Sequence, residues 1–171
     1  MSRIALTSGD VAMKHARRKY VPVGTTLIAS LLVLLPVVVN AAYVPDLGFL
    51  VFIGWRLLRP EMWTARATLP LGLFNDLIAG HPLGQSMALW TITLLLLDFV
   101  ETRAVFRDFW MDWLLASVLI LFNTFGGWFI ALLIGSPSSV LVLWPQLALS
   151  ILAYPVIARM IVVLDRWRLT R

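Results

Sequence analysis

Six apolar runs, separated by short gaps, dominate this sequence of 171 residues. They are Pro22–Tyr43, Leu47–Leu58, Ala67–Gly80, Gly84–Val100, Trp113–Ile134 and Val140–Leu164. A helix needs about 20 apolar residues, each with about 1.5 Å of rise, to cross the hydrocarbon core of a bilayer. The first, fifth and sixth runs meet that length and the fourth nearly does. The second and third are short. We expect them to span the bilayer as tilted helices, to span a locally thinned bilayer, or to enter it as re-entrant segments packed inside the protein.

Composition excludes the main alternatives to a membrane protein. The chain is 60% hydrophobic, only 13% charged and has no cysteine, whereas soluble domains carry roughly 25% charged residues. So little charge cannot coat a water-exposed surface, which argues against a soluble domain, a disordered chain and a disulfide framework. The net charge of +5 is therefore interpreted as membrane topology, and we expect no nucleic-acid partner.

The positive charges occupy alternate gaps. All 14 lysines and arginines lie before the first run, near the gap between runs two and three, in the gap between runs four and five, or towards the C-terminus. The other gaps, Ala42–Asp46, His81–Gly84 and Gly135–Ser139, hold none. Because basic residues gather on the cytoplasmic side, the sequence predicts an all-α, polytopic membrane bundle of about six helices with both termini in the cytoplasm.

Three parts of the chain follow from this topology. Residues 1–21 are predicted to be a basic cytoplasmic tail, 22–165 the transmembrane bundle, and 166–171 a second short basic tail. The first run has a rival interpretation as a signal peptide, since Val39-Asn40-Ala41 resembles a cleavage site. Its length and Pro36 favour a membrane anchor.

The sequence offers little material for catalysis or for a cofactor. No gap after the N-terminal tail exceeds about a dozen residues, so function must lie in the bundle, on its flanks or in short loops. The histidines, His15 and His81, are far apart in sequence, and with no cysteine we expect neither a metal site nor a serine–histidine pair. Asp76 and Asp98 fall at heights that differ by roughly 10 Å in antiparallel helices, too far apart for a carboxylate dyad. We therefore expect a protein that is not an enzyme and has no cofactor.

Asp76 is the most informative single residue. A carboxylate inside an apolar helix usually faces the bundle or a wet cavity, so Asp76 is either a partner- or ligand-facing acid or a cap for the turn at His81–Gly84. Its neighbour Asn75 should point about 100° away and not share one narrow seam with it. Trp90 and Trp128 are interpreted as packing residues. A solvated, mixed-charge loop is predicted from Asp98, Glu101, Arg103, Arg107, Asp108 and Asp112.

One stretch of the chain resembles a known family. Its residues are Pro45-Asp46-Leu47, Trp55, Arg59-Pro60 and Pro70-x-Gly72-x-x-x-Asp76-Leu77-x-x-Gly80-x-Pro82-Leu83-Gly84. This order is similar to that of the MreD family of bacterial rod-shape-determining membrane proteins. The resemblance covers residues 45–84 by motif and the rest of the chain only by size, hydropathy and topology.

The resemblance implies a non-catalytic scaffold subunit of the cell-elongation (peptidoglycan synthesis) machinery in the bacterial inner membrane. Its implied fold resembles the S components of energy-coupling-factor transporters. The implied partner is MreC, with MreB, RodA and the class B elongation transpeptidase as direct or indirect partners beside the membrane lipids. Homo-oligomer formation stays open.

Candidate partner-binding or structural residues follow from the same resemblance. Arg59 and Pro60 would end the second run at the inner interface, and Gly80, Pro82 and Gly84 would set a tight outer turn. Asp76 would stabilise that turn or meet a polar group of MreC. The set is completed by Asp46, Trp55 and Gly72. Small residues at such positions serve either packing within the bundle or an external docking face.

Two other classes remain open. A small-molecule-binding S-component-type transporter subunit would share the fold, although Ala29 is followed four residues later by Val33, so the first run has no Ala-x-x-x-Ala motif there. A lipid-binding membrane protein could use the same bundle.

Overall fold

A computed structural model describes residues 8–34, 44–101, 108–135 and 139–170, and these residues are helical with short connections. The α-helices are α1 (Ser8–Leu31), α3 (Leu47–Leu58), α4 (Ala65–Ala79), α5 (Gln85–Glu101), α6 (Phe109–Leu133) and α7 (Leu143–Thr170). Short 3₁₀ turns are η1 (Leu32–Leu34), η2 (Pro60–Met62) and η3 (Val140–Val142). The all-α prediction is confirmed for this part of the chain, and each predicted run contains one helix. The first helix begins at Ser8, within the segment predicted as a tail.

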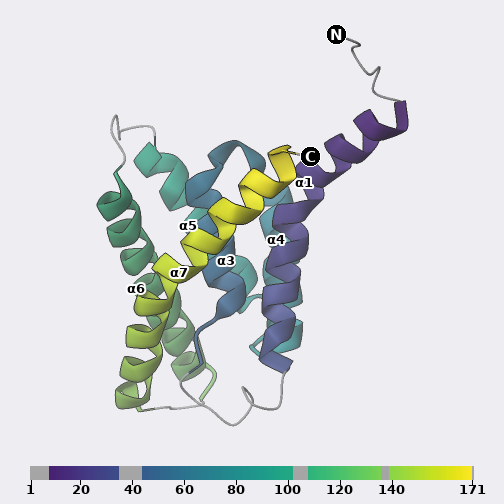
Figure 1. The fold of residues 1–171 in the computed structure, drawn as a ribbon. Coiled ribbons are helices and arrows are strands. Elements are labelled where there is room, and N and C mark those ends of the chain that lie inside the picture. Colours follow the sequence, from purple (N-terminus) through teal and green to yellow (C-terminus); the bar gives the residue numbers. More distant parts are fainter. Residues whose placement is uncertain (1–7, 35–43, 102–107, 136–138, 171) are drawn as a thin grey trace.

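Helix α3 lies at the centre of the bundle (Figure 1). It packs against α1, α6 and α7, and nine of its 12 residues are buried. A helix that is buried on nearly every side must be surrounded by other helices. At about 1.5 Å per residue it is only ~18 Å long, and the chain enters it through Val44–Asp46 from the end of the bundle (Figure 1).

Aromatic side chains fill the space between α3 and its neighbours. The ring of Phe52 stacks on Trp90 of α5 with centroids 5.0 Å apart, and meets Trp63 edge-on at 5.1 Å. Phe52 and Trp90 are both fully buried. Such ring pairs contribute about 0.5–1.5 kcal/mol beyond the area they bury. The packing role predicted for Trp90 is therefore confirmed.

Helices α4 and α5 form a close antiparallel hairpin. A Cβ atom placed on Gly72 would lie 2.5 Å from Cα and 2.7 Å from N of Met87, so only glycine permits this approach of the two backbones. The hairpin turns at Gly80–Gly84. Gly72 is thus used for packing inside the bundle, one of the two roles predicted for it.

The bundle has two distinct ends. The beginning of α1 and the end of α7 lie at one end, which we call the ion-pair end and define by Arg56, Asp98, Glu101, Arg59 and Asp165. The turn of the α4–α5 hairpin and the start of α3 lie at the other (Figure 1), which we call the cavity end.

Large apolar side chains cover the outside of the bundle. Leu95 on α5 is 56% exposed and Leu152 on α7 is 68% exposed, and Phe125 on α6 is exposed as well. Helices α6 and α7 are each long and apolar enough to cross a membrane. Exposed apolar surface on this scale is typical of contact with lipid or with a partner.

Candidate functional site: a polar cavity at one end of the bundle

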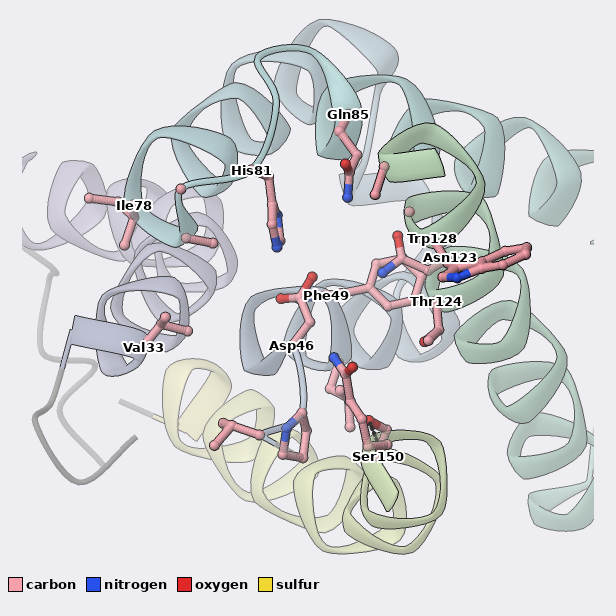
Figure 2. Close-up of a pocket in the computed structure, with 18 of the residues that line it drawn as sticks. Val33, Asp46, Phe49, Ile78, His81, Gln85, Asn123, Thr124, Trp128 and Ser150 are labelled. Atoms are coloured by element: carbon pink, nitrogen blue, oxygen red, sulfur yellow. Dashed lines mark hydrogen bonds between the residues drawn. The ribbon is translucent and has the colours of Figure 1, made fainter. Parts of the chain in front are cut away.

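A cavity of about 750 Å³ opens at the cavity end. Its lining comes from η1 and from five α-helices of the described chain: the start of α3, the end of α4, the start of α5, the second half of α6 and the start of α7. Ligand pockets commonly measure ≈ 300–1,000 Å³ and are mostly apolar with a few convergent polar groups. This cavity has that character, as the close-up in Figure 2 shows.

Asp46 lies at the centre of the cavity wall and caps α3. Its Oδ1 accepts a hydrogen bond from the Phe49 N–H at 3.0 Å, and its backbone oxygen accepts from the Leu50 N–H. The amide of Asn75 approaches its Oδ2 at 3.5 Å. Burial raises the pKa of the Asp46 carboxyl, an effect that these hydrogen bonds and nearby His81 partly offset. Asp46 is thus both an N-cap and a wall of the cavity.

Asp76 is buried, with 1% of its surface exposed, and caps α5 from α4. Its Oδ2 accepts from the Gly84 N–H at 2.9 Å and its Oδ1 from the Ser86 N–H at 2.7 Å. These are N–H groups at the start of α5 that have no partner within the helix. Of the two roles left open by the sequence, the geometry shows the cap.

Asn75 points to the same turn as Asp76, against expectation. Its amide donates to Ser86 Oγ at 3.2 Å, while Asp76 accepts from the Ser86 backbone. Both side chains are buried. The prediction that the two side chains could not share one helix–helix seam was wrong. The start of α5 lies beside the end of α4, and Ser86 contacts Asn75 through its side chain and Asp76 through its backbone.

The glycines of the hairpin turn have the conformation that their positions require. Gly80 ends α4 with φ +69° and Gly84 precedes α5 with φ +94°, a left-handed region that residues with a Cβ avoid. Pro82 lies between them and accepts the Gln85 N–H through its carbonyl oxygen. The tight turn predicted from Gly80, Pro82 and Gly84 is present.

The other polar side chains of the cavity are His81, Gln85, Asn123, Thr124, Gln146 and Ser150. His81, Gln85 and Asn123 point towards the space in front of Asp46 (Figure 2). His81 Nδ1 lies 3.4 Å from Ser86 Oγ and 4.0 Å from Asp76. The side-chain oxygen of Asn123 is buried and has no hydrogen-bond partner among the described residues. The cavity therefore presents more acceptors than cations.

The ion-pair end compensates its charges in another way. Arg56 of α3 is 1% exposed and pairs with Asp98 and, through both terminal nitrogens at 2.8 and 2.9 Å, with Glu101. The expectation that Asp98 and Glu101 belong to a loop was wrong, because they lie on the last turns of α5 and pair with a buried arginine, although the Asp98 side chain stays 54% exposed. Arg103 and Arg107 of that predicted loop lie outside the described residues.

A second network at this end joins α3 to α7. Arg59, the residue after α3, bonds to Asp165 Oδ2 at 2.9 Å, and Arg168 bonds to Asp165 Oδ1 at 2.7 Å. The Asp165 hydrogen bond raises the pKa of the Arg59 guanidinium. Pro60 directly follows Arg59 and begins η2, a position that suits a residue without an N–H.

Trp55 belongs to the core beside this network. Its indole N–H donates to Thr25 Oγ1 of α1 at 2.8 Å, and the guanidinium of Arg168 lies 5.2 Å from its ring centroid. It is fully buried. Trp55 therefore ties α3 to both α1 and α7.

The structure divides the nine predicted site residues between the two ends. Asp46, Asp76, Gly80, Pro82 and Gly84 lie at the cavity end, Trp55, Arg59 and Pro60 lie towards the ion-pair end, and Gly72 holds the hairpin. Sequence reasoning missed Arg56 and Asn123. A single arginine inside a short apolar run, with two acids three residues apart on another helix, was the available signal for the first.

No family model matches the chain, and no curated protein or solved structure matches it either.

Proposed function

We propose that the chain is a non-catalytic scaffold of the bacterial elongation complex, related to the MreD family, that offers its flanks to MreC in the inner membrane. In this proposal all six helices lie in the bilayer, the ion-pair end faces the cytoplasm and the cavity end faces outward. The single-sided distribution of lysine and arginine supports that orientation.

One observation carries the proposal: the motif residues are used inside the bundle, whereas large apolar surfaces stay uncovered outside it. Asp76, Gly72 and Trp55 each have an internal partner. The exposed faces of α5, α6 and α7 carry side chains that are free to contact lipid or another helix. A helical bundle with short loops and exposed apolar helix faces is suited to binding partner proteins in the membrane rather than to turning over a substrate.

Photo-crosslinking tests this proposal. A photoreactive phenylalanine analogue is placed at Leu73, Leu95, Phe125 or Leu152, exposed positions on α4, α5, α6 and α7, with buried Ile53 as the matched control. MreC should be captured from one helix face and not from Ile53. Its absence from all four positions, at normal protein level in rod-shaped cells, would refute the scaffold role.

A second candidate is a small-molecule-binding subunit of the S-component type. The cavity of about 750 Å³ supports it, because it is built from η1 and five α-helices and carries convergent polar groups. Co-purification with a transporter ATPase module rather than with MreC would favour this candidate.

A further inference from the structure

The carboxylate of Asp46 lines the cavity. Asp46 meets the Phe49 N–H and the Asn75 amide, and neither a lysine nor an arginine is among the residues that line the cavity. The sequence also places no lysine or arginine in the adjoining gaps. A partly buried carboxylate is costly without a counter-charge, and His81 is the one cavity residue that could supply it within the chain.

A second polar side chain, Asn123, lies on the opposite wall of the same space (Figure 2). Its side-chain oxygen is buried without a hydrogen-bond partner in the described part of the chain. Leaving a buried acceptor unsatisfied costs about 1–3 kcal/mol. Asp46 accepts only the Phe49 N–H and a long contact from Asn75 among the described residues, so its carboxylate keeps acceptor capacity for a donor bound in the cavity.

The rest of the lining is suited to an apolar body. Phe49 and Trp128 line the cavity, and Leu50, Leu77 and Ile120 add aliphatic surface. Aromatic faces also favour cations. An anionic ligand finds no lysine or arginine among these residues, so the lining selects against phosphate and carboxylate groups.

We propose that the cavity binds a small organic molecule with a primary ammonium group and an apolar or aromatic body. The ammonium donates to Asp46, and the body lies along the aromatic lining. The inference deepens the second candidate function, but binding of an amine does not depend on the partner that the protein serves. It is therefore measured apart from MreC capture.

Three probes of one shape test the charge requirement. They are 2-phenylethylamine, 2-phenylethanol and 3-phenylpropionate, offered to the full chain in nanodiscs of zwitterionic lipid, with binding measured by equilibrium dialysis against empty nanodiscs. The amine should bind about tenfold or more tightly than the alcohol, and the carboxylate should not bind. This ratio is the usual effect of one hydrogen bond to a charged group. Equal binding of the amine and the alcohol would overturn the proposal, as would no saturable binding of the amine.

Matched variants locate the site. Asp46→Asn retains an N-cap of similar quality and should weaken amine binding about tenfold or more, whereas Glu61→Gln, an exposed acid in η2, should leave it unchanged. Gln146→Lys places an ammonium group in the lining and should also abolish amine binding without touching the α3 cap. Retained amine binding in folded Asp46→Asn, or in folded Gln146→Lys if the first variant does not fold, would place the ligand elsewhere and refute the proposal.

The amine-binding proposal and the scaffold proposal can fail independently of each other. MreC capture together with no amine binding would refute the inference alone, and amine binding without MreC capture would refute the scaffold role alone.

Discussion

The two ends of the bundle hold their buried charges by opposite means. At the ion-pair end, arginine side chains meet carboxylates: Arg56 with Asp98 and Glu101, and Arg59 with Asp165. At the cavity end, the carboxylates of Asp46 and Asp76 meet backbone N–H groups at the starts of α3 and α5. One end is therefore a network of side chains and the other a set of helix caps.

This difference has a functional consequence. A side-chain network closes the space between helices, because the partners reach across and fill it. A cap leaves the carboxylate beside its own helix end, so the space in front of it stays open, as it does before Asp46 (Figure 2). The cavity exists at the end where the acids are satisfied locally.

The largest effect is expected at the ion-pair end. Arg56→Ala removes a fully buried guanidinium and with it the ion pairs to Asp98 and Glu101, so we expect a loss of about 3–5 kcal/mol in the free energy of unfolding. Arg66→Ala, an exposed arginine of α4, should change it by less than about 0.5 kcal/mol. Denaturant titration in mixed micelles measures both. Equal losses would show that the buried arginine contributes no more than a surface charge, and the contrast between the ends would fail.

The second effect concerns the hairpin that builds the cavity end. Gly72→Ala forces a methyl group into the backbone of Met87, at 2.5 Å from its Cα, so α4 and α5 must separate at a cost of about 2 kcal/mol. Gly24→Ala in α1, where a Cβ meets nothing within 4 Å, should be neutral or stabilise by up to about 1 kcal/mol. The same titration compares them. A harmless Gly72→Ala would show that the helices can separate freely.

The sequence was sufficient to predict the helices and the hairpin turn. The apolar runs locate α3, α4 and α5 to within two residues, as in the end of α3 before Pro60, whereas α7 continues to Thr170, past the last run. The tight turn was implied by the family resemblance, and Gly80 and Gly84 suit the left-handed backbone found there. These features depend on local residues.

Features that depend on tertiary contacts could not be predicted in the same way. The pairing of Arg56 with Asp98 joins residues 42 positions apart, and hydropathy alone placed that arginine near a gap. The prediction for Asn75 and Asp76 failed because helical geometry gives the directions of side chains on their own helix. It does not show that one residue of the neighbouring helix, Ser86, contacts both of them. The cavity depends on the relative positions of η1 and five α-helices, α3 to α7.

The smallest effect tests the cap itself. Asp76→Asn keeps the size of the side chain but leaves one oxygen where the Gly84 and Ser86 N–H groups now have two, so we expect a loss of about 1 kcal/mol. Asp108→Asn is the matched control, because Asp108 occupies the N-cap position of α6 without a side-chain hydrogen bond to it, and it should have no measurable effect.

The loss in stability caused by Asp76→Asn, compared with the losses caused by Arg56→Ala and Gly72→Ala, shows how the two ends differ. A cap shares its load with backbone groups that water or an asparagine oxygen can partly satisfy, whereas a buried guanidinium has no such substitute. Asp76→Asn should therefore cost less than Arg56→Ala in the same micelle titration. If the two costs were equal, Asp76 would hold a charge as essential as that of Arg56, and the open cavity at its end would need another explanation than local capping.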